Sequence, residues 1–122
     1  MNNGWLATGA ILAALGVALG AFGAHGLKAI LTPERLEVWK TATHYHLIHA
    51  VAVAALAAGG VAGDPRGEWA LRLMTAGLLV FSVSLYALCL TGVTWLGAIT
   101  PLGGLGMIAG WATLAWAALT AR

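Results

Sequence analysis

Charged side chains are confined to short stretches of the chain, with long apolar blocks between them. If histidine is counted as neutral, no charged residue occurs at positions 4–27, 41–63 or 73–121. A helix that crosses about 30 Å of hydrocarbon at 1.5 Å per residue needs roughly twenty residues. The first two blocks therefore predict one membrane-spanning helix each, and the third block is long enough to predict two.

Two Thr-Pro pairs and one glycine indicate where the helices begin and end. Threonine suits the N-cap, and proline suits the first helical position, where its missing N–H would have been unpaired anyway. Thr32-Pro33 therefore opens the second helix, Gly92 ends the third, and Thr100-Pro101 opens the fourth. We expect helices near residues 4–23, 33–60, 68–91 and 101–121. The predicted fold is all-α, an integral membrane four-helix bundle that forms a single domain.

Composition supports a lipid environment and excludes other classes. Hydrophobic residues make up 61% of the chain and charged residues 8%, whereas soluble proteins use about a quarter charged residues. The first apolar block has no basic residue before it, so we expect it to be retained as a span and not cleaved as a secretory signal. The net charge of +2 is scattered, which argues against nucleic-acid binding. The single cysteine, Cys89, has no intramolecular disulfide partner.

The second helix is predicted to be longer than the hydrocarbon is thick. Its first two turns carry Glu34, Arg35, Glu37 and Lys40, so they should stand in the headgroup region, with Trp39 as an interfacial anchor. The positive-inside rule does not orient the chain. Three basic residues on one side oppose three on the other, namely Lys28, Arg35 and Lys40 against Arg66, Arg72 and Arg122.

Glycines recur at the spacing of one helical turn, as in Gly16 and Gly20 or Gly106 and Gly110. Small residues at this spacing let helix backbones approach closely. These glycine-rich faces predict either packing within the chain or contacts in a homo-oligomer or larger membrane complex. Membrane lipid is the other expected partner.

Polar side chains inside the predicted spans gather in one half of the membrane, and such groups are costly unless they are paired. His49 lies about 12 Å below Thr41 at 1.5 Å per residue, and Tyr45 is one turn shallower on the same face. Every helix contributes to this polar site, whose predicted members are His25, Tyr45, His49, Ser82, Tyr86 and Thr100. A purely structural role stays open for each, with His49 bonded to Tyr86, Thr100 as a cap, and His25 as a turn anchor.

The histidines are weak candidates for a metal or haem site. His46 and His49 share a helix face, and His25 is a possible third ligand, whereas a bis-histidine haem would use His25 and His49. No carboxylate lies inside the three apolar blocks, and no serine-nucleophile or phosphate-loop motif occurs. We therefore expect no metal, no cofactor and no enzyme activity.

Several segments together resemble one family. They are LGAFGAHGL (19–27), FSVSLY (81–86), TPLGG (100–104) and GW (110–111), with Trp39, Thr41, Ala42, Tyr45 and His49 at fixed spacing. This pattern is similar to the YgdD-like family of small bacterial inner-membrane proteins, a domain of unknown function. The resemblance implies four spans, both termini in the cytoplasm, no known enzyme activity and no established ligand. The family pattern falls on His25, Tyr45, His49, Ser82, Ser84, Tyr86, Thr100 and Pro101.

Three functions remain open on these grounds. The leading hypothesis is a non-enzymatic membrane protein whose polar histidine-containing site binds or passes a small molecule or proton. The second is a structural accessory subunit of a larger membrane complex. The third is a haem- or metal-binding subunit.

Overall fold

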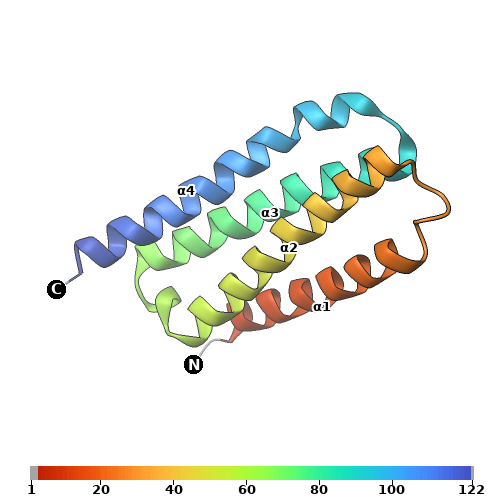
Figure 1. Cartoon of the computed structure of the whole chain (residues 1–122). Coiled ribbons are helices and arrows are strands. Elements are labelled where there is room, and N and C mark those ends of the chain that lie inside the picture. The colour runs from red at the N-terminus through yellow and green to blue at the C-terminus, as the bar shows by residue number, and fades with distance from the viewer. Residues whose placement is uncertain (1–2, 122) are drawn as a thin grey trace.

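The computed structural model describes residues 3–121 and consists of four long helices. They are α1 (Gly4–His25), α2 (Pro33–Ala58), α3 (Pro65–Thr91) and α4 (Thr100–Leu119), with short 3-10 helices η1 (Val61–Gly63) and η2 (Thr94–Ala98) in two connections. The long helices run up and down in chain order, and each packs mainly on its neighbours in sequence (Figure 1). The predicted all-α fold is confirmed, and the predicted helix ranges agree within three residues.

The helix ends follow from local chemistry at most of the predicted places. The Thr32 hydroxyl accepts a hydrogen bond from the Arg35 backbone N–H at 3.2 Å, so the first Thr-Pro pair is a cap as predicted. Gly92 ends α3 in the left-handed region at φ 75°, which glycine adopts without strain. Thr100 is not a cap, because α4 begins at Thr100 itself and the preceding residue holds the N-cap position. Asp64 caps α3, which therefore begins at Pro65, three residues before the predicted start.

Three of the helical segments meet the length and composition of a membrane span within the described residues: α1, α3, and η2 with α4. The helix α2 does not, because charged residues fill its first turns and histidines lie farther along. It nevertheless joins the end of α1 to the start of α3 and packs against both. We therefore expect α2 to cross the membrane as well, with its own polar groups shielded by its neighbours.

A stripe of three glycines, seven residues apart, brings α1 against α2. Gly9, Gly16 and Gly23 are all buried. A methyl group added at any of them would collide with a residue of α2, namely Ala54, Leu47 and Trp39 in turn. This spacing repeats every two helical turns and keeps one side of α1 flat over its whole length.

Glycines also hold α4 against α3. A Cβ atom at Gly106 would lie 3.0 Å from the Cα of Gly77, and one at Gly110 would lie 2.6 Å from the Cγ of Met74. The predicted close approach of helices within the chain is confirmed for these glycines and for Gly16. Gly20 was predicted to share that role, but nothing lies within 4 Å of its missing side chain.

All four helices meet in the middle of the molecule. Leu12, Ala50, Leu78 and Met107, one from each helix, form a buried apolar cluster. Ala50 directly follows His49, and the backbone carbonyl of Leu12 accepts a hydrogen bond from His46. The two histidines therefore lie at the level where all four helices contribute to one buried cluster.

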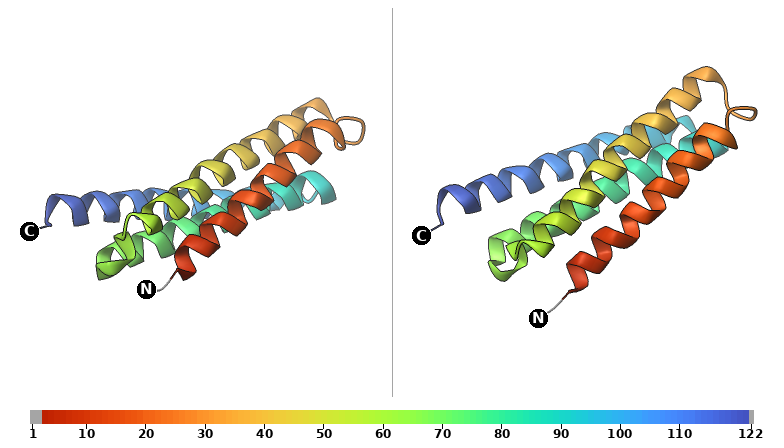
Figure 2. Two further views of the ribbon diagram at one scale, coloured as in Figure 1. Left: turned by 90° about the horizontal axis from the view of Figure 1, so that it is seen from below. Right: turned by 60° about the horizontal axis from the view of Figure 1, so that its bottom comes forward.

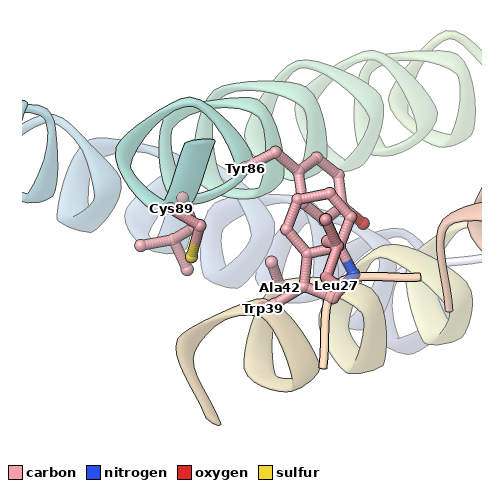
Figure 3. Close-up of a cluster of buried hydrophobic side chains, with 6 residues drawn as sticks. Leu27, Trp39, Ala42, Tyr86 and Cys89 are labelled. Carbon is pink, nitrogen blue, oxygen red and sulfur yellow. The ribbon is translucent and has the colours of Figure 1, made fainter. Parts of the chain in front are cut away.

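Trp39 is buried and does not act as the interfacial anchor that its position suggested. Only 2% of it is exposed, and its indole N–H donates to the carbonyl of Leu19 at 2.9 Å. Its ring lies 4.6 Å from that of Tyr86, within a cluster that includes Leu27 and Cys89 (Figure 3). The ring fits there because Gly23 leaves room for it on α1.

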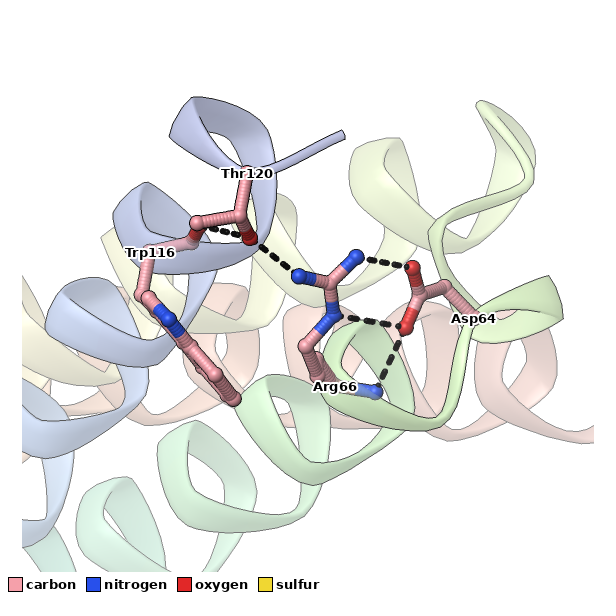
Figure 4. A network of polar contacts seen from close by, with 4 residues as sticks. All are labelled: Asp64, Arg66, Trp116 and Thr120. Atoms are coloured by element: carbon pink, nitrogen blue, oxygen red, sulfur yellow. Dashed lines mark hydrogen bonds and ion pairs between the residues drawn. The ribbon is translucent and has the colours of Figure 1, made fainter. Parts of the chain in front are cut away.

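At the end of the molecule opposite Trp39, polar contacts join the start of α3 to the end of α4 (Figure 4). We call this group, Asp64, Arg66, Trp116 and Thr120, the polar clamp. The Arg66 guanidinium donates to both carboxylate oxygens of Asp64 and to the Thr120 hydroxyl, and it lies 5.2 Å from the Trp116 ring centre. Its hydrogen bonds to Asp64 lower the pKa of that carboxyl below its ordinary value. A cation at this place also complements the negative end of α4.

Candidate functional site

His46 cross-links three helices through both of its ring nitrogens. Its Nδ1 lies 2.8 Å from the Tyr86 hydroxyl on α3, and its Nε2 lies 2.7 Å from the Leu12 carbonyl on α1. A carbonyl oxygen only accepts, so Nε2 carries a proton and donates, and in the neutral imidazole Nδ1 then accepts from the tyrosine hydroxyl. With 4% of the residue exposed, His46 is a buried group whose two ring nitrogens both have partners.

The bond from His46 to Leu12 repeats the arrangement that holds Trp39. In both cases a side-chain N–H of α2 reaches an α1 carbonyl that lies four residues before a glycine: Leu12 before Gly16, and Leu19 before Gly23. In a helix that carbonyl already accepts from the residue four positions on. The glycine leaves space for a second donor beside it, and a Cβ atom at Gly16 would lie 3.3 Å from the His46 ring. The glycine stripe therefore opens the backbone of α1 to hydrogen bonding.

His49 faces a different direction and bonds to α4. The Trp111 indole N–H donates to His49 Nε2 at 2.9 Å, and His49 Nδ1 lies 2.9 Å from the carbonyl of Tyr45. An indole N–H only donates, so Nε2 is unprotonated and Nδ1 carries the hydrogen. The tautomer of His49 is thus opposite to that of His46. A second proton on His49 would remove the acceptor that Trp111 uses.

The surroundings of His49 reach the surface of the bundle. His49 itself is 6% exposed, but Tyr45 is 41% and Trp111 is 40% exposed. The Tyr45 ring stacks on that of His49 with centroids 6.3 Å apart, and it packs on Phe81 at 4.9 Å. Two amphipathic side chains therefore separate the histidine from the membrane-facing surface.

Serine and threonine hydroxyls tie α3 to its neighbours. The buried Ser82 hydroxyl donates to the carbonyl of Ala42 on α2 at 3.2 Å. Ser84 donates back to the carbonyl of Phe81 at 2.9 Å, as expected for a serine within a helix, and also lies 2.7 Å from the Thr100 hydroxyl. Thr100 is therefore not a cap, and its hydroxyl pairs with Ser84 instead of with a histidine or Tyr86.

The predicted polar set is brought together only in part. Tyr86 bonds to His46, so the expected pair of His49 and Tyr86 is wrong: His46, one turn earlier on α2, faces α3, while His49 faces α4. His25 ends α1 as an exposed residue whose side chain has no hydrogen-bond partner among residues 3–121, so it does not join the site.

Sequence reasoning missed His46 and Trp111 as members of the network. The signal for His46 was its seven-residue spacing from Trp39, matched by Gly16 and Gly23 on the facing helix. A search for glycines four residues apart does not reveal that match. For Trp111 the signal was its place in the GW segment (110–111) of the family pattern, which does not reveal its partner, because that depends on how α4 lies beside α2.

The weak metal candidates do not converge in the structure. His46 and His49 each use both ring nitrogens for other partners, and His25 lies at the end of α1. Among the described residues, no group of three histidine, cysteine, aspartate or glutamate side chains is placed to hold a metal ion. Two cavities, of about 610 and 410 Å³, lie elsewhere, and no histidine lines either of them.

Comparison with known proteins identifies the family. Residues 19–104 match the family described as protein of unknown function (DUF423). The chain belongs to this family. The resemblance to YgdD-like proteins that its segments carry is confirmed, since this is the same family. DUF423 proteins of this kind are multi-pass membrane proteins, and the chain shares that class.

Relatives cover nearly the whole chain. The UPF0382 membrane protein YwdK of Bacillus subtilis is 46% identical over 113 residues, which cover 91% of this chain and 92% of the relative. A UPF0382 membrane protein of Staphylococcus aureus is 44% identical over 108 residues, 87% of each chain. One from Schizosaccharomyces pombe is 40% identical over 111 residues, 86% of this chain and 92% of the relative, so the family extends beyond bacteria. No solved structure matches.

Proposed function

We propose that this DUF423 protein is a non-enzymatic membrane protein that binds a small hydrogen-bonding molecule, or accepts a proton, at His49. The observation that supports this is the access to His49 Nε2. Its only described partner is the Trp111 indole, which is 40% exposed. If the indole turns away, an acceptor nitrogen opens toward the membrane-facing surface. His46, by contrast, lies between Tyr86 and Leu12 and supports the fold.

Variants of His49 and Trp111 test this proposal by opposite effects. His49→Leu removes the acceptor and should abolish binding. Trp111→Phe removes the competing donor and should strengthen binding by up to about tenfold, because the unpaired acceptor gains a partner when the ligand arrives. His44→Leu is the matched control, since the exposed His44 side chain has no hydrogen bond among residues 3–121 and its ring packs edge-on against Tyr45.

Native mass spectrometry of each purified variant measures which small molecules remain bound. Histidine resonances labelled with ¹⁵N report the proton in the same samples. A molecule lost in His49→Leu and kept in His44→Leu supports a binding site, and protonation of Nε2 between pH 5 and 8 supports a proton acceptor. If His49→Leu retains the same molecules as wild type and the Nε2 resonance does not change with pH, the proposal is wrong.

A structural role is the second candidate, and the saturated bonding of His46, Ser82 and Trp39 favours it. The protein would then be an accessory subunit of a larger membrane complex, or a homo-oligomer. The glycines of α1 and α4 that contact α2 and α3 are covered within the chain, so a partner protein would have to bind to another surface. Purification in mild detergent with light scattering tests this, since a stoichiometric partner or a dimer mass would favour it. An absorbance spectrum and metal analysis test the haem or metal alternative.

We further propose that the protein lies in the bacterial inner membrane with both termini in the cytoplasm, on the basis of the family resemblance. Reporter fusions at Arg122 and Pro33 distinguish the two orientations. A cytoplasmic signal at Arg122 with an outward one at Pro33 is expected. The reverse pattern would turn the histidine-rich half of α2 toward the cytoplasm.

A further inference from the structure

A cavity of about 610 Å³ lies at the end of the molecule opposite His25, between the start of α1 and the connection from α2 to α3. These segments lie side by side in each view (Figures 1 and 2). The cavity is lined by Asn3, Trp5, Leu6, Ala57, Ala58, Gly60, Ala62, Gly63 and Glu68. It is separate from the histidine network and has mixed walls, with apolar side chains beside a few polar groups.

Two side chains of this wall favour positive charge. Glu68 contributes a carboxylate, and Trp5 contributes an indole ring, whose face attracts cations. Ala57 and Ala58 are the last residues of α2, so the negative end of that helix dipole meets the cavity. The first turns of α1 and α3 also line it and present positive dipole ends, so the preference for a cation rests on Glu68 and Trp5. No lysine or arginine is among the lining residues.

The charge of Glu68 is only partly satisfied within the chain. One carboxylate oxygen, Oε1, accepts from Arg72 at 3.0 Å, and this ion pair is half exposed on both sides. The first turn of α3 also favours an acidic residue at this position. Oε2 has no hydrogen bond from residues 3–121. The other nearby guanidinium, Arg66, is bound to Asp64 and Thr120.

We propose that this cavity binds an ammonium group carried on an apolar or amphiphilic molecule. The ammonium would lie between Glu68, the Trp5 ring and the end of α2, while its apolar part would contact Leu6 and Ala62. Arg72 is then an internal competitor that holds the carboxylate when the cavity is free. The ammonium group has two possible sources, a membrane-lipid headgroup and a free amine.

Substituting Glu68 and Arg72 in turn tests whether the Glu68 carboxylate binds an ammonium group or only pairs with Arg72. Tetramethylammonium is the probe, and its affinity is read from the Trp5 indole resonance of the purified protein, assigned with Trp5→Phe. Glu68→Gln should weaken binding by about two- to fivefold, the range for a half-exposed ion pair. Arg72→Gln should strengthen it by a similar factor. Glu37→Gln is the control, since Glu37 pairs with Lys40 at the other end of the molecule and lines neither cavity.

Opposite changes at Glu68 and Arg72, with no change at Glu37, would establish the site. Absence of saturable binding, or equal affinity in wild type and Glu68→Gln, would overturn it. Nanodiscs then distinguish the two sources. Weaker tetramethylammonium binding in phosphatidylethanolamine than in an uncharged glycosyl diacylglycerol lipid, which has the same net charge but no ammonium group, indicates that the lipid headgroup occupies the cavity, and equal binding in both lipids indicates a site for a free amine.

Discussion

Replacing Gly23 with alanine tests the close contact on which the α1–α2 interface depends. The added methyl group would collide with the Trp39 indole, which is 2% exposed and has little room to move. It would also disturb the indole hydrogen bond to the carbonyl of Leu19. The prediction is that Gly23→Ala destabilises the protein even though alanine is the better helix former.

Three contributions set the change in the free energy of unfolding: two are destabilising and the third is stabilising. Overpacking a buried site costs about 1–3 kcal/mol, and losing a neutral hydrogen bond costs about 0.5–1.5 kcal/mol. Replacing a glycine within a helix by alanine stabilises the helix by about 1 kcal/mol. The net loss in the free energy of unfolding should therefore be about 0.5–3.5 kcal/mol. Gly20→Ala is the matched control on the same helix, since its new methyl group meets nothing within 4 Å and should stabilise by up to about 1 kcal/mol.

Cys89 provides the assay. It is the only cysteine in the chain and is 1% exposed, so a thiol-reactive fluorophore should label it when the bundle opens. Unfolding of each variant in detergent is followed by this labelling and by circular dichroism. A midpoint for Gly23→Ala at or above that of Gly20→Ala would refute the argument, because the two variants differ only in what the methyl group meets.

Three further predictions address the network, the membrane depth and the polar clamp. His46→Leu and Tyr86→Phe should each cost about 1–3 kcal/mol, and the double variant should cost less than their sum; additive losses in a double-mutant cycle would show that they are not partners. Spin labels at Glu37 and Ile48 should differ in accessibility to a water-soluble quencher, and equal accessibility would contradict the protruding start of α2. The lowered pKa of Asp64 means that its stabilising effect is complete above the ordinary value near 3.8 and is lost as pH falls through the folded value. Wild type should therefore be more stable than Asp64→Asn at pH 6, and the difference should vanish in acid.

The sequence alone determined the helical architecture, for a simple physical reason. Lipid requires each span to satisfy its own backbone hydrogen bonds, so long blocks without charge must be helices. Caps are equally local, because Thr32 and Gly92 act through the geometry of their own turns. Apolar length and end chemistry were therefore enough to place four helices to within a few residues.

Only the tertiary structure decided which polar groups are partners. His46 and His49 lie about one turn apart on α2, so at 3.6 residues per turn their side chains point less than 100° apart around the helix axis. Nevertheless His46 faces Tyr86 and His49 faces Trp111. That choice depends on the rotation of α2 against α1, which the buried glycines set by fixing where the backbones touch. The spacing of residues within one segment does not say which distant segment they will contact. The depth of the polar residues along their helices could therefore be predicted from the sequence, but the pairs that they form depend on how the helices pack.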